Sequence, residues 1–243
     1  NTNHLIAAMW TRYRTPQKSI VAGISSGLFS TTNGGSSWKR DTTGFPHDDE
    51  NLGRISLTYA PSNSSVLYAL VANFVNAGGV YKSTNNGNSW TQKFDGSGLG
   101  ESQVWYNNII VVHPMNPNGI WIGMTSMYKS TDGGTTFNDA LPWTVHVDHH
   151  AMAYAPSDAS RIVLGNDGGI FTCDDGGATW SKSYNLPITQ FYAGTIDEQY
   201  PTHLFGGTQD NGTNRTHTNA DDSWFEFYGG DGFYCLVDPT DSN

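Results

Sequence analysis

The sequence predicts an all-β fold of repeated, antiparallel four-stranded sheets, and two sets of sequence repeats together with the composition predict it. The first repeat is a ten-residue turn pattern, aromatic-x-Ser/Thr-x-Asp/Asn-x-Gly-x-x-Trp. It occurs without gaps at Phe29–Trp38, Tyr81–Trp90, Tyr128–Phe137 and Phe171–Trp180. The copies recur roughly every 45 residues, a period typical of repeat architectures.

A second pattern lies out of phase with the first. Short apolar runs end at Pro61, Pro114, Pro156 and Pro239, and Ile196–Glu198 occupies the corresponding place between the last two. The runs that end at Pro61, Pro114 and Pro156, and the segment Ile196–Glu198, are each followed by another short apolar segment, by a third that leads into the turn, and by a fourth after the turn. Four short strands per repeat, separated by turn residues, predict the blades of a β-propeller.

These repeats divide the chain into about five blades within a single propeller domain or a fragment of one. The expected bounds are 1–45, 46–96, 97–142, 143–186 and 187–230, with 231–243 as a closing strand or the first strand of a next blade. The chain opens in what reads as a second strand, at Leu5–Met9, and closes in a first strand, at Phe233–Val237. The last strand therefore either completes the N-terminal blade or begins another one.

Composition excludes several classes of protein. Charged residues make up 14% of the 243 residues, too few for a coiled coil, and the 31 aromatic residues (8 Trp, 12 Tyr and 11 Phe) argue against disorder. No apolar run is long enough to span a membrane. A net charge of −10 without a basic cluster disfavours nucleic acid and anionic membranes, whereas cations and neutral glycans remain suitable ligands. The two cysteines, Cys173 and Cys235, are expected to be buried free thiols.

The repeated turn has a structural explanation. An Asp or Asn side chain can accept hydrogen bonds from backbone N–H groups that follow it, and glycine permits positive φ. The closing aromatic residue is large enough to fill the wedge between blades. We therefore expect a structural role, in preference to a calcium or ligand site in each turn, for Asn33, Gly35, Trp38, Asn85, Gly87, Trp90, Asp132, Gly134, Phe137, Asp175, Gly177 and Trp180.

The turn pattern resembles the Asp-box, or BNR repeat, of sialidases, xyloglucanase-type glycoside hydrolases, sortilin-type receptors and photosystem assembly factors, all of them β-propellers. The segments His146–Ala151, Gly165–Gly169, Gly206–Gly212 and Gly229–Gly232 resemble large secreted, sortilin-like bacterial repeat proteins. The resemblance implies an extracellular or cell-surface protein that binds a glycan or an extended peptide, with further propeller repeats of one parent protein as possible partners. Sialidases use three arginines for the substrate carboxylate, and several of the six arginines here fall in expected strands, which argues against that activity.

Most polar residues that turn chemistry does not explain fall in the loops between blades or between second and third strands. In a propeller these loops share one face, so we expect them to surround the central channel and to form a binding site. The aromatic residues Trp10 and Trp143 add surface for a sugar or a peptide. The candidate ligand-binding residues are His146, His150, Asp167, Gln209, Asn211, Trp105, Tyr106, Arg12 and Arg14.

The sequence also suggests a divalent metal site. In an extended strand His146, Asp148 and His150 would point to one side, and such a set of ligands suits zinc. The alternative is that these side chains bond the exposed backbone of adjacent blades. Calcium would instead favour the oxygen ligands of Asp167, Asp210 and Asp231.

Three functions remain open from the sequence. The favoured one is a binding module, because no acid/base pair stands out among the turn aspartates. The second is a glycoside hydrolase in which Asp148 pairs with Asp210 or Asp231 as acid and base or nucleophile. In the alternative interpretation of these aspartates, they only shape glycine-flanked turns. The third function is that of a structural subunit of an extracellular assembly.

Overall fold

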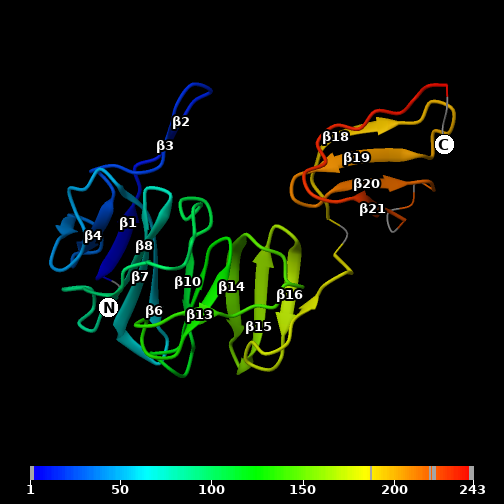
Figure 1. The fold of residues 1–243 in the computed structure, drawn as a ribbon. Helices are drawn as coiled ribbons and strands as arrows, with labels where there is room; N and C mark the ends of the chain where they lie inside the picture. The colour runs from blue at the N-terminus through cyan, green and yellow to red at the C-terminus, as the bar shows by residue number, and fades with distance from the viewer. Residues whose placement is uncertain (1–2, 187, 219, 221–222, 241–243) are drawn as a thin grey trace. The chain divides into compact units, whose positions relative to one another are not determined.

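A computed structural model describes residues 3–186, 188–218, 220 and 223–240. The described residues form strands and no helix, so none of their segments is a helix able to cross a membrane. The chain divides into two compact units, Asn1–Asn166 with Phe171–Ser181, and Asp167–Ile170 with Lys182–Asn243. Each unit is described by itself below, and Figure 1 labels the strands.

The strands β1 to β13 form four sheets, all of them in the first unit. A three-stranded sheet has the order β1-β4-β5, a hairpin pairs β2 with β3, and two four-stranded sheets have the orders β6-β7-β8-β9 and β10-β11-β12-β13 (Figure 1). The bounds are β1 Leu5–Met9, β2 Tyr13–Arg14, β3 Ser19–Ile20, β4 Gly27–Thr31, β5 Lys39–Asp41, β6 Leu52–Ala60, β7 Asn63–Asn73, β8 Asn76–Ser83, β9 Thr91–Phe94, β10 Ile109–Val112, β11 Ile120–Gly123, β12 Met127–Ser130 and β13 Asn138–Asp139.

Two further four-stranded sheets follow, β14-β15-β16-β17 and, in the second unit, β18-β19-β20-β21. Their bounds are β14 His149–Ala155, β15 Asp158–Asn166, β16 Gly169–Cys173, β17 Ser181–Lys182, β18 Phe191–Ile196, β19 Leu204–Thr208, β20 Thr213–Thr216 and β21 Phe225–Tyr228. Each four-stranded sheet is an up-and-down meander, because its strands pair in chain order. The all-β prediction with four-stranded antiparallel blades is confirmed.

The two ends of the chain depart from this pattern. In the described residues β1 pairs with β4 alone, so this sheet has three strands. The strand expected at Phe233–Val237 is not formed. Phe233 has a φ of 47°, which interrupts an extended path, and its ring stacks on Tyr192 at 4.9 Å. The assignment of 231–243 to a closing or next blade stays a prediction.

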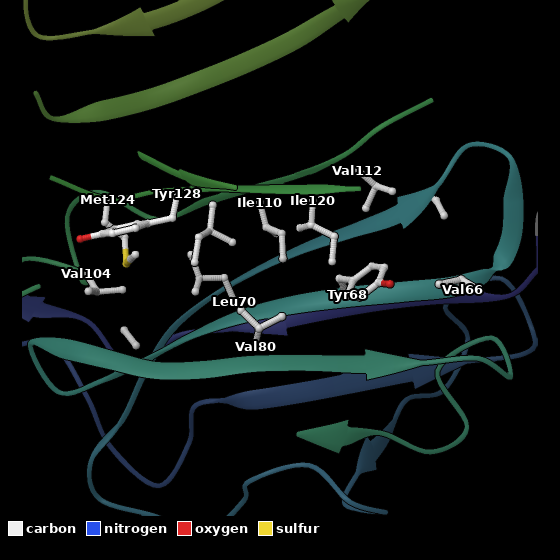
Figure 2. Close-up of a cluster of buried hydrophobic side chains, with 13 residues drawn as sticks. Val66, Tyr68, Leu70, Val80, Val104, Ile110, Val112, Ile120, Met124 and Tyr128 are labelled. Carbon is white, nitrogen blue, oxygen red and sulfur yellow. The ribbon is translucent and has the colours of Figure 1, made fainter. Parts of the chain in front are cut away.

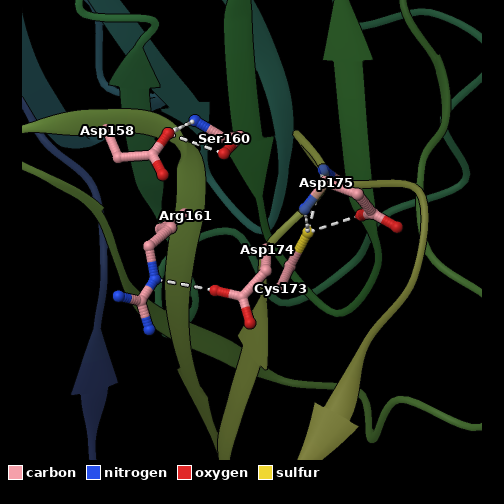
Figure 3. Close-up of polar contacts among 7 residues, drawn as sticks. Asp158, Ser160, Arg161, Cys173, Asp174 and Asp175 are labelled. Atoms are coloured by element: carbon pink, nitrogen blue, oxygen red, sulfur yellow. Dashed lines mark hydrogen bonds and ion pairs between the residues drawn. The ribbon is translucent and has the colours of Figure 1, made fainter.

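The repeated turns are closed by their own side chains. In the second copy the Ser83 hydroxyl donates to Asn85 Oδ1 at 2.9 Å and accepts from Gly87 N at 2.9 Å, while Asn85 Oδ1 accepts from Ser89 N at 3.0 Å. In the fourth copy Cys173 takes the place of the serine, as Figure 3 shows: its thiol donates to Asp175 Oδ1 at 2.9 Å. These local bonds give the expected structural role to the turn residues.

Apolar cores lie between neighbouring sheets. In the largest, side chains of β7 such as Tyr68 and Leu70 pack against Ile120 and Ile122 of β11, and all four are fully buried (Figure 2). Burial raises the pKa of Tyr68 to about 12, and its hydroxyl donates to Pro117 O at 2.8 Å. The cores hold successive blades together through side chains rather than through backbone pairing.

The closing aromatic residues of the turns contact the preceding sheet or the loop that follows it. The rings of Trp90 and Phe45 lie 5.5 Å apart, those of Phe137 and Phe94 lie 5.3 Å apart, and those of Trp180 and Trp121 lie 6.3 Å apart. The first copy differs from the prediction, because Trp38 is 45% exposed. No sheet precedes it among the described residues, so its ring has no partner surface of this kind.

Candidate functional site

Aromatic rings and guanidinium groups from well-separated segments gather at one place in the first unit. Trp10 and Arg12 follow β1, Arg54 lies in β6, and Trp105 lies between β9 and β10. Arg12 Cζ lies 5.7 Å from the Trp10 ring centre and 5.3 Å from that of Trp105. Arg54 Cζ lies 5.8 Å from the Trp10 ring centre. We call these residues, with Tyr106 and His150, the rim cluster.

Two further rings extend the rim cluster toward β14. The ring centres of Trp105 and Tyr106 are 5.8 Å apart. The rings of Tyr106 and His150 meet edge to face, with their centres 5.0 Å apart. Arg54 Nη1 donates to the Tyr106 carbonyl oxygen. The cluster therefore joins residues from four successive sheets and their connections. Tyr106 is 42% exposed, whereas Trp10, Arg12, Arg54 and Trp105 are partly buried.

Local hydrogen bonds position these side chains. Trp10 Nε1 donates to Val21 O at 2.7 Å. Arg12 Nη1 donates to Tyr13 O at 3.0 Å, to Ser19 Oγ at 3.1 Å and to Ile20 O at 3.0 Å, so the guanidinium is fixed at the base of the β2–β3 hairpin. A planar group held in this way retains a defined orientation toward a ligand.

A buried polar layer surrounds the first residues of β10 and β14. Asn107, which is fully buried, donates through Nδ2 to Asp148 Oδ1 at 2.5 Å, and this bond orients the carboxylate. His149 N donates to Met124 O at 2.9 Å. Burial, followed by the charges of His146 and His150, lowers the pKa of His149 to about 4. The buried imidazole is therefore neutral at physiological pH.

The geometry assumed for the zinc site is wrong. Strand β14 begins only at His149, and Asp148 has a φ of 64°, so residues 146–150 do not form one extended strand. His146 Nδ1 lies 3.0 Å from Val147 O, and His150 packs against Tyr106. Across the described ranges, no group of three or more His, Cys, Asp or Glu side chains is placed to hold a metal ion. The calcium candidates Asp167, Asp210 and Asp231 likewise do not form such a group.

The remaining predicted residues meet in the second unit, around the loop between β19 and β20. Asn211 Nδ2 donates to Asp167 O at 2.8 Å, and Asp231 Oδ1 accepts from Asp210 N at 2.9 Å. Gln209 Oε1 accepts from the Tyr192 hydroxyl. The Asp231 carboxylate thus binds the backbone of the neighbouring loop, which is the structural role that turn chemistry predicts.

The structure divides the candidate catalytic residues between the units. Asp148 belongs to the first unit, and Asp210 and Asp231 belong to the second, so the pairing of Asp148 with either stays a prediction. Arg14 lies in the exposed β2 strand and takes no part in the contacts of the rim cluster. Trp143, in the connection that leads to β14, is 94% exposed.

Sequence reasoning missed Arg54 and Asn107. Arg54 lies within an apolar strand, and only the packing of β6 beside the β9–β10 connection brings it to Trp10 and Tyr106. The one available signal was a charged residue inside a strand of mostly uncharged residues. Asn107 resembles any loop asparagine until its contact with Asp148 is seen.

No protein-family profile matches the chain. A curated xyloglucanase of Hypocrea jecorina is 26% identical over 223 residues, which cover 83% of this chain and 24% of that protein. Two solved structures are similar with a TM-score of 0.54: a GH74 enzyme of Niastella koreensis, at 20% identity over 92% of this chain and 37% of its own, and the GH74 xyloglucanase of Xanthomonas campestris, at 16% identity over 92% of this chain and 36% of its own.

These similarities decide the fold. The chain has a β-propeller fold, as the repeats predict, and its similarity is to propellers of glycoside hydrolases. It spans about a quarter of the length of the curated relative and little more than a third of the two solved chains. At these levels of sequence identity the similar structures establish the fold alone, and one fold can carry many functions.

Proposed function

We propose that this chain is a glycan-binding β-propeller module that holds its ligand at the rim cluster. The observation that carries the proposal is the convergence of Trp10, Trp105 and Tyr106 with the Arg12 and Arg54 guanidinium groups. Partly exposed rings offer flat apolar surface to the C–H faces of a sugar, and fixed donors beside them suit its oxygens.

Similarity to a xyloglucanase supports a carbohydrate in preference to a peptide as the ligand. Within the same proposal, the repeated turns belong to the Asp-box type, and the protein acts outside the cell or at its surface. The hydrogen bonds of Asn85, Asp132 and Asp175 within their turns support the first point. The sortilin-like grouping and a peptide ligand remain the alternative within this fold.

Calorimetric titration with soluble xyloglucan and other plant and bacterial polysaccharides tests the proposal. Trp105→Ala removes a ring of the cluster and is expected to weaken binding about tenfold, as loss of a central aromatic contact does. Tyr59→Ala is the matched control, because Tyr59 is an exposed aromatic residue (59%) near the other end of β6. Binding that is insensitive to Trp105→Ala, or no binding to any polysaccharide, refutes the proposal.

The second candidate function is glycoside hydrolysis, favoured by the xyloglucanase similarity over 83% of the chain. Asp148, whose carboxylate is oriented by Asn107, would serve as the acid or the base. Release of reducing sugars from xyloglucan by the wild type, lost in Asp148→Asn, supports it. Asp158→Asn is the control, because Asp158 is the exposed first residue of β15 and accepts hydrogen bonds from Ser160 (Figure 3).

A further inference from the structure

The two arginines of the rim cluster lack an anionic partner. Of the four arginines outside it, Arg40 pairs with Asp48 at 2.6 Å and Arg161 with Asp174 at 2.7 Å (Figure 3), whereas Arg14 and Arg215 form no ion pair with the described residues. Within the described parts of the chain, no carboxylate lies within ion-pair distance of Arg12 or Arg54. What distinguishes Arg12 and Arg54 is that both lie, partly buried, beside the Trp10 ring.

The cost of this arrangement is greatest at Arg54. The side chain is partly buried, and burial lowers the pKa of its guanidinium. A guanidinium does not lose its proton under ordinary conditions, so the desolvated charge persists unless an anion compensates it. Trp10 offers the faces of its ring to both cations, but a ring quadrupole compensates a charge only in part.

Both guanidinium groups also keep free donors. Arg12 uses Nη1 for its three hydrogen bonds, and Arg54 uses Nη1 for its bond to Tyr106 O. Among the described residues, neither Nη2 has a hydrogen-bond acceptor. Two N–H edges near one indole ring therefore remain available, and such edges match the two oxygens of a carboxylate.

We propose that the rim cluster binds the carboxylate of an acidic sugar, a uronic acid unit of a polysaccharide, through Arg12 and Arg54. In this arrangement Trp10, Trp105 and Tyr106 contact the sugar ring that carries the carboxylate. The inference rests on the proposed glycan-binding function and narrows its ligand class. The net charge of −10 predicts a cation or a neutral glycan as the ligand, whereas this inference predicts an anionic sugar. The reason is that the ligand faces two local cations, and their charge outweighs the total charge of the chain.

An acidic peptide carries carboxylates too, but the composition of the rim cluster favours a sugar. Three rings lie beside the two cations, and stacking surface of this kind suits a rigid pyranose that carries its carboxylate directly on the ring. A polyanion that binds through charge alone would need an extended row of basic side chains, and the cluster holds only two arginines.

The test compares trigalacturonate with its methyl ester, which has the same sugar rings without the negative charges, by calorimetric titration of the full chain. The wild type is expected to bind the acid at least about tenfold more tightly than the ester, the size of a charge-assisted contact. Arg12→Met and Arg54→Met each remove this preference, and Arg54→Lys keeps part of it. Arg161→Met is the control and keeps it in full, because Arg161 pairs with Asp174 at an exposed site.

The outcomes separate this inference from the proposed function. Equal affinity for acid and ester, with binding of xyloglucan retained, overturns the inference and leaves glycan binding intact. Absence of binding to every saccharide overturns both. A preference for the acid that survives in Arg12→Met and Arg54→Met overturns the assignment to these residues. Binding of a poly-glutamate peptide without binding of trigalacturonate overturns the sugar assignment. The comparison of acid with ester on the wild type holds even if a variant fails to fold.

Discussion

Gly176 and Gly177 are adjacent in the fourth repeated turn, and they provide a matched test of why the turn needs glycine. Their φ values are 72° and 104°, so alanine is strained at either position. A Cβ at Gly176 would meet no atom within 4 Å, whereas a Cβ at Gly177 would lie 2.6 Å from Trp121 Cζ2 and 2.7 Å from Cη2. Only the second substitution therefore adds a collision to the backbone strain.

The size of the collision follows from the surroundings of Trp121. Its side chain is 1% exposed, and its indole N–H donates to the Tyr154 hydroxyl at 2.8 Å, so the ring has little freedom to move. Ordinary carbon contacts are about 3.5–4.0 Å, so the ring or the turn must shift by about 1 Å. We expect Gly176→Ala to cost about 1–2 kcal/mol through its backbone alone. Gly177→Ala should cost a further 1–3 kcal/mol, roughly, through overpacking.

Urea denaturation followed by tryptophan fluorescence measures both variants, and the difference between them is the informative quantity. Gly177→Ala combined with Trp121→Leu should recover part of the additional loss, because the smaller side chain frees the space for the Cβ. Equal destabilisation by the two single substitutions, within about 0.5 kcal/mol, would refute the packing argument.

Three other predictions concern buried or turn residues of the first unit. Cys173→Ser should keep or raise stability by up to about 1 kcal/mol, because a hydroxyl is a stronger partner than a thiol for Asp175 and the turn backbone, and thermal unfolding measures it. The pKa of His149 is about 4 in the folded protein, against 6.5 for a free imidazole. Its contribution to the free energy of unfolding is therefore complete above pH 6.5 and decreases by about 3 kcal/mol as the pH falls toward 4. His149→Asn should flatten the dependence of the free energy of unfolding on pH in that window. The Glu101 carboxylate accepts from Thr125 N at 3.1 Å and Ser126 N at 2.9 Å; Glu101→Gln should therefore cost about 1–3 kcal/mol in urea denaturation, and an unchanged midpoint would contradict this role.

The pattern of strands and turns could be read from the sequence because its causes are local. The hydrogen bonds that close a repeated turn join residues two to four positions apart, as from Ser83 to Gly87, and neighbouring strands of each blade are also neighbours in the chain. Side chains and glycines at fixed spacing therefore determine the turn wherever the pattern occurs. The bond from Asp210 N to the Asp231 carboxylate is of the other kind, because it joins two loops whose residues lie 21 positions apart.

The extended geometry assumed for the zinc site is not formed, and the reason is a contact between residues distant in the chain. The prediction assumed that an alternating sequence adopts an extended backbone, and a single residue, Asp148 at a φ of 64°, breaks the alternation. That conformation depends on its surroundings, since Asp148 N donates to Thr125 O and its carboxylate accepts from Asn107, 41 positions away. No residue within five positions of Asp148 indicates that Thr125 and Asn107 are its partners.

The sequence by itself determined the repeat, the blade and the turn, and it also named Arg12, Trp105, Tyr106 and His150 as residues of a binding face. Only the tertiary structure decided that these residues touch one another and that Arg54 belongs with them. The physical reason is the range of the forces involved. Backbone hydrogen bonds and turn chemistry act between near neighbours in the chain, whereas contacts between rings and cations on successive blades depend on how the apolar cores bring the sheets together.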